Sequence, residues 1–146
     1  MEAVDAPPIR EPSEPRRPRV LVVDDDPDIR LICATNLRLD GFDVIEAADG
    51  QEGLDCVYGA DPDLVLLDIC MPVLDGFGLA AAVRHTERTR DVPLVFLTGE
   101  ASREIEERAF AVGAAGYFTK PFDPAAVSRF VADILVGSRP APDATA

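Results

Sequence analysis

Short apolar runs alternate with longer amphipathic segments along most of this chain. The apolar runs are rich in β-branched and aromatic residues and are too short for helices. They predict five strands, over residues 20–23, 42–45, 64–67, 94–97 and 117–119. The segments between and after them predict five helices, over residues 27–39, 51–58, 76–84, 102–112 and 124–135. Asp26 and Asp123 each precede a proline at the first helical position, so we expect them to be N-caps.

Most of the predicted strands carry apolar residues at every position. A strand of that kind is buried on both faces, as in a parallel sheet with helices on either side. Five strand–helix units with right-handed crossovers predict an α/β fold, a doubly wound three-layer (βα)5 sandwich of the flavodoxin-like type with parallel strand order 2-1-3-4-5. In such open sheets, ligands bind at the carboxyl ends of the strands, near the switch between the first and third strands.

The two ends of the chain differ in composition from the middle. Residues 1–18 contain five prolines and no hydrophobic periodicity, which predicts a disordered, proline-rich tail. Residues 138–146 predict a second disordered tail. The 146 residues therefore divide into these tails and a single domain over residues 19–137.

Composition narrows the class of protein. The chain has 14 basic and 27 acidic residues, and its net charge of −13 opposes direct binding to nucleic acid. No apolar stretch approaches the roughly 18 residues needed to cross a membrane, and the N-terminus lacks a secretory pattern. We therefore expect a cytoplasmic protein without membrane contact. The three cysteines have no C-x-x-C spacing, so they indicate neither a disulfide framework nor a zinc site.

Polar side chains stand at the ends of four predicted strands. The set consists of Asp24, Asp25 and Asp26 after the first strand, Asp68 after the third, Thr98 after the fourth and Lys120 after the fifth. On the predicted topology they converge on one edge of the sheet, where carboxylates repel one another unless a cation or a lysine offsets them. Such oxygen ligands suit Mg²⁺, which often bridges to phosphate. We interpret Asp26 as a helix cap and Asp75–Gly76 as a turn and N-cap signal.

Four motifs in this order resemble the receiver domains of two-component response regulators. They are VLVVDDDP at 20–27, DLVLLDICMPVLDG at 63–76, PLVFLTG at 93–99 and GAAGYFTKPF at 113–122. The resemblance covers roughly residues 19–137. It implies a domain that accepts a phosphoryl group and acts as a signalling switch, with self-catalysed phosphoryl transfer and slow autodephosphorylation as its only reactions.

The resemblance also implies a role for individual residues. Asp68 is the expected phosphoacceptor and a metal ligand. Asp25 is the expected direct ligand of Mg²⁺, for which Mn²⁺ can substitute, and Asp24 acts through a metal-bound water. The backbone carbonyl of Cys70 is a further expected ligand.

Three more residues are expected to respond to the phosphoryl group. Lys120 pairs with one phosphoryl oxygen, and the Thr98 hydroxyl bonds to another. Tyr117 resembles the aromatic residue that changes rotamer in step with Thr98. The Lys120–Pro121 peptide bond is expected to be cis.

The implied partners are proteins. The phosphoryl donor is a histidine kinase or a histidine phosphotransfer protein, and the output reaches a downstream protein that the sequence does not identify. A homodimer through the fourth helix, the fifth strand and the fifth helix fits the same pattern. We expect either a stand-alone receiver or a fragment that lacks its output domain.

Two alternative functions stay open at this point. The first is a haloacid dehalogenase-like phosphatase with Asp24 as the nucleophile of a D-x-D motif. Against it, Asp28 stands where that family prefers Thr or Val, and the chain has no room for a cap domain. The second is a constitutive pseudo-receiver that serves only for protein contacts. The aspartate that becomes phosphorylated, Asp68 or Asp24, distinguishes these functions.

Overall fold

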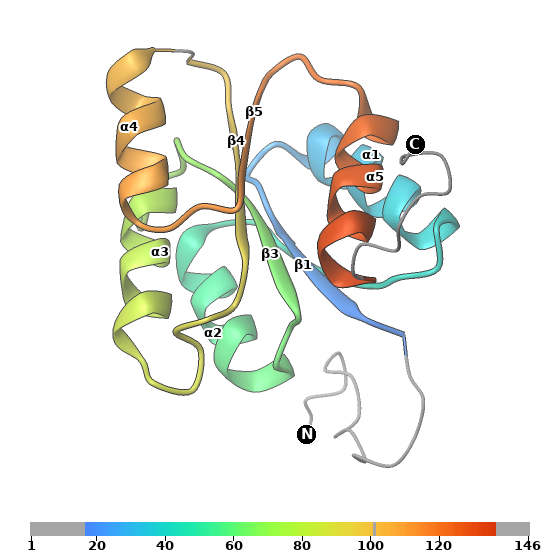
Figure 1. Cartoon of the computed structure of the whole chain (residues 1–146), viewed down its shortest axis with the longest axis horizontal. Helices are drawn as coiled ribbons and strands as arrows, with labels where there is room; N and C mark the ends of the chain where they lie inside the picture. The colour runs from blue at the N-terminus through green and yellow to red at the C-terminus, as the bar shows by residue number, and fades with distance from the viewer. Residues whose placement is uncertain (1–16, 101, 137–146) are drawn as a thin grey trace, which may run out of the picture.

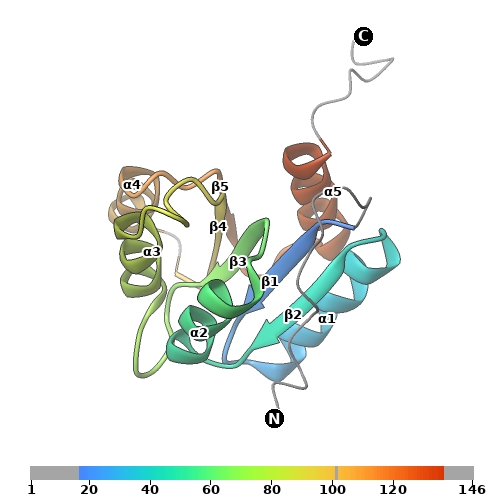
Figure 2. The ribbon, with the colours of Figure 1, turned by 90° about the horizontal axis from the view of Figure 1, so that it is seen from below.

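A computed structural model of the chain describes residues 17–100 and 102–136 (Figure 1). The predicted C-terminal tail and residues 1–16 of the predicted N-terminal tail lie outside the described residues. The described residues form one sheet of five strands between two layers of helices (Figures 1 and 2). No helix within them is both long enough and apolar enough to cross a membrane.

All neighbouring strands in the sheet are parallel. The strands are β1 (Arg19–Val23), β2 (Asp43–Ala47), β3 (Leu64–Asp68), β4 (Leu94–Thr98) and β5 (Gly116–Thr119). Their order is β2-β1-β3-β4-β5, which confirms the predicted topology. The order reverses between β1 and β3, so the carboxyl ends of these two strands form the switch point where doubly wound folds bind ligands.

The helices cover both faces of the sheet. They are α1 (Pro27–Leu39), α2 (Gly50–Ala60), α3 (Gly76–His85), α4 (Arg103–Ala111) and α5 (Pro124–Leu135). Helices α1 and α5 lie on one face, and α2, α3 and α4 lie on the other (Figures 1 and 2). The side chains of Asp26, Asp75 and Asp123 accept hydrogen bonds from main-chain N–H groups of the first helical turn, which confirms all three predicted N-caps.

The predicted start of the second strand is wrong by one residue. Gly41 has a φ of 98°, a conformation that favours glycine, and it ends α1. The Phe42 N–H then donates to the carbonyl of Leu37, 3.1 Å away, so Phe42 lies in the turn that closes α1, and β2 begins only at Asp43. Its buried aromatic ring explains why the sequence pattern included it in the strand.

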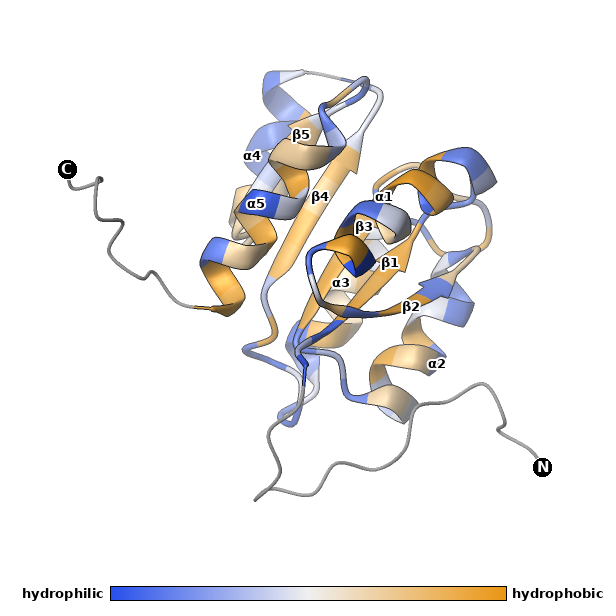
Figure 3. Cartoon of the chain, turned by 90° about the vertical axis from the view of Figure 1, so that its right-hand side faces the viewer, coloured by the Kyte–Doolittle hydropathy of each residue, from blue (hydrophilic) through white to orange (hydrophobic). Residues whose placement is uncertain are grey.

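The core has two parts, one on each face of the sheet. Because successive side chains of a strand point to opposite faces, Leu21 and Val23 pack with the α2–α4 layer. Val20 and Val22 pack with α1 and α5. Every residue of β1, β3 and β4 is buried, as predicted for a sheet covered on both faces. Figure 3 shows these strands in hydrophobic colours, whereas α4 is mostly hydrophilic and buries only Ala109 completely.

Candidate functional site

Three carboxylates and one ammonium group meet at the carboxyl edge of the sheet. Asp24 directly follows β1, Asp68 is the last residue of β3, and Lys120 directly follows β5. The Nζ atom of Lys120 lies 3.0 Å from Oδ2 of Asp24 and 3.3 Å from Oδ1 of Asp68. One carboxylate oxygen each from Asp24, Asp25 and Asp68 lies within 4.8 Å of the others. The structure thus brings together four of the residues that the sequence placed at this edge.

The loop after β1 is held by its own aspartates. Oδ1 of Asp24 accepts a 2.9 Å hydrogen bond from the N–H of Asp26, and Oδ1 of Asp26 accepts one from the N–H of Asp28. The Asp24 side chain is completely buried, whereas Asp25 is exposed. Asp26 therefore acts as a helix cap, as interpreted from the sequence, and Asp25 presents its carboxylate to solvent beside the other two.

Electrostatics at this site favour a bound cation. Burial, and then the charge of Asp24, raise the pKa of Asp68 to about 6, although Lys120 lowers it. Burial lowers the pKa of Lys120, but its hydrogen bonds and charge interactions with Asp24 and Asp68 outweigh that effect and raise it. One ammonium group thus faces three carboxylates, and a negative charge is left over.

The donor set fits Mg²⁺. Receiver domains generally bind Mg²⁺ at an acidic pocket, and carboxylate oxygens on neighbouring strand ends are the ligands that this ion takes in proteins. The exposure of Asp25 leaves room for water on the solvent side. The main-chain carbonyl of Cys70, which the resemblance adds to the ligands, stays a prediction.

Thr98 and Tyr117 lie outside this charged cluster. The buried Thr98 hydroxyl accepts a 3.0 Å hydrogen bond from the N–H of Glu100 and lies 3.3 Å from its carbonyl oxygen. The ring of Tyr117 packs against Phe110 of α4, with centroids 6.3 Å apart, and its hydroxyl oxygen is buried. Burial raises the pKa of Tyr117. Their hydrogen bonds and packing connect these two residues to the β4–α4 loop and to α4.

The main chain after β5 is anchored to β4. The N–H of Lys120 donates a 2.7 Å hydrogen bond to the carbonyl of Thr98. The Lys120–Pro121 peptide bond is cis, as expected from the resemblance. The main chain of Lys120 is therefore held by β4, and its long side chain reaches Asp24 just after β1 and Asp68 at the end of β3.

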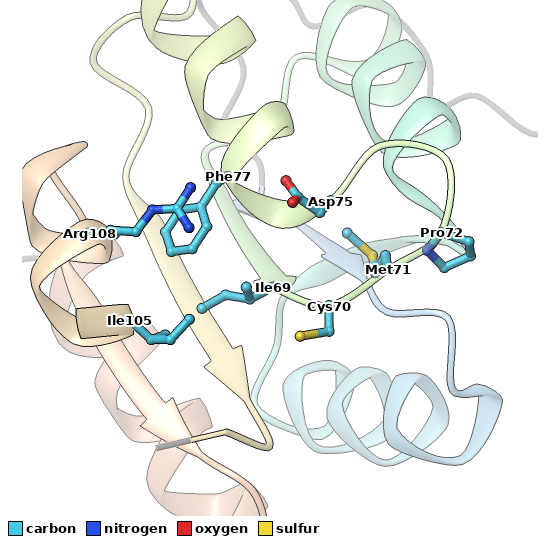
Figure 4. Close-up of a pocket in the computed structure, with 8 residues that line it drawn as sticks. All are labelled: Ile69, Cys70, Met71, Pro72, Asp75, Phe77, Ile105 and Arg108. Atoms are coloured by element: carbon cyan, nitrogen blue, oxygen red, sulfur yellow. The ribbon is translucent and has the colours of Figure 1, made fainter. Parts of the chain in front are cut away.

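A cavity of about 470 Å³ adjoins the loop after Asp68 (Figure 4). It lies between the β3–α3 loop and α4, and its lining includes Cys70, Ile105 and Arg108. The Arg108 guanidinium carbon lies 4.0 Å from the centroid of the Phe77 ring, a cation–π contact that joins α4 to α3. The Cys70 residue is exposed. Partial burial of its thiol, and then the charge of Asp68, raise the pKa of the thiol. The pocket therefore lies between α4 and the loop that follows Asp68.

Position 76 requires glycine because the main chain of Asp68 and Ile69 lies close to it. The sequence did not reveal this role. The N–H of Gly76 donates a 2.8 Å hydrogen bond to the carbonyl of Ile69. A Cβ atom at this position would clash with the main-chain oxygen of Asp68 and lie 2.8 Å from Cα of Ile69. Both neighbours are backbone atoms, so neither can rotate away. The Asp75–Gly76 turn thus sets the distance between α3 and the end of β3, which carries Asp68.

Replacing Gly76 with alanine should destabilise the protein by about 1–3 kcal/mol, as overpacking does elsewhere. Gly59 is a matched control because it lies in α2 and nothing stands within 4 Å of its would-be Cβ. There, Gly59→Ala should stabilise the protein by roughly 1 kcal/mol through helix propensity. Urea unfolding of the two variants measures both effects, and equal changes for the two would show that the close approach at Gly76 carries no cost.

Two further features of the site were missed from the sequence. Lys120 is the only lysine in the chain, all other basic residues being arginine. The presence of a single lysine can be read from the sequence and could have drawn attention to Lys120. The Arg30 side chain donates a 2.8 Å hydrogen bond to the carbonyl of Asp24, and no sequence pattern indicates such a contact.

Comparison with known proteins identifies the family to which this chain is similar. The family model described as the response regulator receiver domain matches residues 20–132. A DNA-binding dual master transcriptional regulator, RpaA, from a Synechocystis species is 41% identical over 106 residues, which are 73% of this chain and 44% of that protein. The transcriptional regulatory protein PrrA of Mycobacterium tuberculosis is 43% identical over 105 residues, 72% of this chain and 44% of that protein. The chain spans about half the length of the curated relatives it matches.

Solved structures show the same fold. The Vibrio cholerae chemotaxis protein CheY4 is 35% identical, with a TM-score of 0.73, and the match covers 84% of this chain and 99% of that one. A receiver domain of a Francisella response regulator is 29% identical, with a TM-score of 0.77 and coverage of 84% and 100%. Receiver domains are signalling domains rather than enzymes in the usual sense. From its family match, its strand order and the acidic cluster at its switch point, the chain belongs to the response regulator receiver domain family.

Proposed function

We propose that this domain accepts a phosphoryl group on Asp68 from a phosphohistidine of a histidine kinase or phosphotransfer protein. The observation that carries the proposal is the position of Lys120, whose ammonium group bridges Asp68 and Asp24. A carboxylate held beside a fixed positive charge at a strand end is arranged for phosphoryl transfer, which depends mainly on positioning and charge stabilisation.

Each residue has a defined part in the transfer. A carboxylate oxygen of Asp68 forms the new bond to phosphorus as the bond between phosphorus and the donor nitrogen breaks, and the donor histidine keeps the electron pair. Lys120 offsets negative charge on the phosphoryl oxygens. Mg²⁺, held by Asp25, Asp68, the Cys70 carbonyl and, through water, Asp24, would supply further positive charge. Hydrolysis of the acyl phosphate on Asp68 later returns the domain to its starting state.

The signal would reach the surface through Thr98 and α4. To donate its proton to a phosphoryl oxygen, the Thr98 hydroxyl has to give up the 3.3 Å hydrogen bond that it donates to the carbonyl of Glu100. That change frees the β4–α4 loop, and α4 is the helix with the fewest buried residues. Tyr117, packed on Phe110, would then change position with α4. The face formed by α4, β5 and α5 would bind a downstream protein or a second copy of the domain.

The output activity is a separate part of the proposal. The name of the Synechocystis relative describes a DNA-binding regulator, so the comparison does not support the expectation that nucleic acid is not a partner. The charge of −13 supports the narrower proposal that this domain itself does not contact DNA. DNA binding, where present, would belong to a further domain of a longer protein.

A small acyl phosphate offers a test without a kinase. After incubation with Mg²⁺, intact mass should show the gain of one phosphoryl group, and a chelator should prevent it because the acidic cluster lacks enough positive charge of its own. Absence of any gain with Mg²⁺ would favour the constitutive pseudo-receiver. Continuous release of phosphate with no stable covalent product would favour the phosphatase.

A further inference from the structure

The guanidinium group of Arg30 ties the acidic loop to its surroundings. Its Nη1 donates a 2.8 Å hydrogen bond to the carbonyl of Asp24, and its Nε lies 3.5 Å from Oε1 of Glu46 on β2. Glu46 is also held by Arg38, whose Nη1 lies 3.2 Å from Oε2. The Arg30 side chain is only 20% exposed. One side chain thus connects α1, the end of β1 and β2.

The carbonyl of Asp24 lies just beyond the β1–β2 ladder. Val23 and Ala47 form the last pair in register, and the last ladder bond runs from the N–H of Asp24 to the carbonyl of Ala47, over 3.2 Å. The chain then leaves the sheet, and Arg30 supplies the donor for the Asp24 carbonyl. Since buried carbonyl groups need a partner, loss of this donor would let the Asp24 main chain shift.

We propose that Arg30 is a positioning residue for the Mg²⁺ site, acting through the main chain of Asp24 and oriented by Glu46. The inference rests on the proposed function, because it assumes that the acidic cluster binds Mg²⁺. Asp24 and Asp25 are consecutive, so a shift of the Asp24 carbonyl moves both carboxylates. Mutation of a residue that orients metal ligands in this way typically weakens metal binding about 10- to 100-fold.

Charge and position predict opposite effects of removing Arg30. As a positive charge alone, Arg30 would repel a divalent cation, and its removal would strengthen Mg²⁺ binding. Glu46, 3.5 Å away, offsets much of that charge. The hydrogen bond to the Asp24 carbonyl remains as the main contribution, and its loss weakens binding. The direction of the change therefore separates the two effects.

Titration calorimetry of the full chain with MgCl₂ tests the proposal. Arg30→Gln should bind Mg²⁺ about tenfold more weakly than the unsubstituted protein. Arg30→Lys keeps a charged donor and should fall between the two. Phosphorylation by a small acyl phosphate gives a second readout, because the Mg²⁺ concentration for half-maximal rate should rise while the rate at saturating Mg²⁺ is retained. A loss of folded protein would instead lower the rate at every Mg²⁺ concentration.

Arg38→Gln is the matched control. Arg38 lies on the same helix and pairs with the same Glu46, but its contacts are to Glu46 and to the carbonyl of Val44 rather than to the acidic loop. Its Mg²⁺ affinity should stay unchanged. If the unsubstituted protein binds Mg²⁺ and Arg30→Gln binds it equally or more tightly, the positioning role is wrong and the proposed function stands. If the unsubstituted protein binds no Mg²⁺, the proposed function itself fails.

Discussion

Asp68→Asn should stabilise the metal-free domain by up to about 3 kcal/mol near neutral pH. In the folded protein, burial and the charge of Asp24 raise the pKa of Asp68 from 3.8 to about 6. The folded state therefore holds the Asp68 proton more tightly than the unfolded state, and ionisation costs stability. The Asp68 side chain is only 6% exposed, so solvent screens this cost little. Asparagine has the same shape without the charge and removes the cost.

The stability cost of ionised Asp68 depends on pH in a defined direction. The cost is absent below the unfolded pKa of 3.8, grows between 3.8 and about 6, and is complete above that range. Urea unfolding in the presence of a chelator should therefore show the advantage of Asp68→Asn at about pH 7.5 and its decline toward about pH 4.5. Asp133→Asn removes an exposed charge on α5 and should change stability by less than about 0.5 kcal/mol. An Asp68→Asn variant that is less stable at neutral pH would show that Asp68 is not under electrostatic strain.

Lys120→Met should slow phosphorylation by a small acyl phosphate about 100- to 1000-fold at saturating Mg²⁺, the usual effect of losing one preorganised charge or donor. The ammonium group lies 3.3 Å from the attacking carboxylate of Asp68, and no other lysine exists to replace it. Methionine keeps the length and apolar stem of the side chain. The decrease in the phosphorylation rate therefore measures the contribution of the positive charge of Lys120 rather than that of its packing.

The matched control removes a positive charge elsewhere. Arg129 is exposed on α5, and Arg129→Met should leave the phosphorylation rate unchanged. The rate is measured by intact mass over time, with unfolding curves to confirm that both variants are folded. A Lys120→Met variant that reacts as fast as the Arg129→Met control would contradict the role assigned to Lys120.

Much of the fold was predictable because its strongest signals are local. The all-apolar runs of β1, β3 and β4 have few alternatives to a sheet buried on both faces. The start of β2 was harder to predict, since Phe42 is apolar and buried whether it lies in the turn after a helix or begins a strand. The convergence of Asp24, Asp68 and Lys120 followed from topology alone, because carboxyl ends of parallel strands share one edge.

What the sequence did not reveal depends on contacts between side chains and distant main chain. Arg30 reads as one more polar residue of an amphipathic helix, and only the structure shows that it bonds the carbonyl of Asp24. Gly76 reads as part of a turn, and its close approach to the Asp68 carbonyl requires the packing of α3 against β3. The hydrogen bonds of the Thr98 hydroxyl to Glu100 likewise depend on the path of a loop. Such contacts leave no periodic pattern.

The most direct test of this account is to identify the aspartate that carries the phosphoryl group. The protein and its Asp68→Asn and Asp24→Asn variants are incubated with a small acyl phosphate, with and without Mg²⁺, and intact mass and peptide mapping locate the product. We expect one phosphoryl group on the unsubstituted protein, only with Mg²⁺, mapped to Asp68 and absent from Asp68→Asn. A phosphoryl group that persists in Asp68→Asn and disappears in Asp24→Asn would contradict the receiver mechanism and identify Asp24 as the nucleophile of a phosphatase.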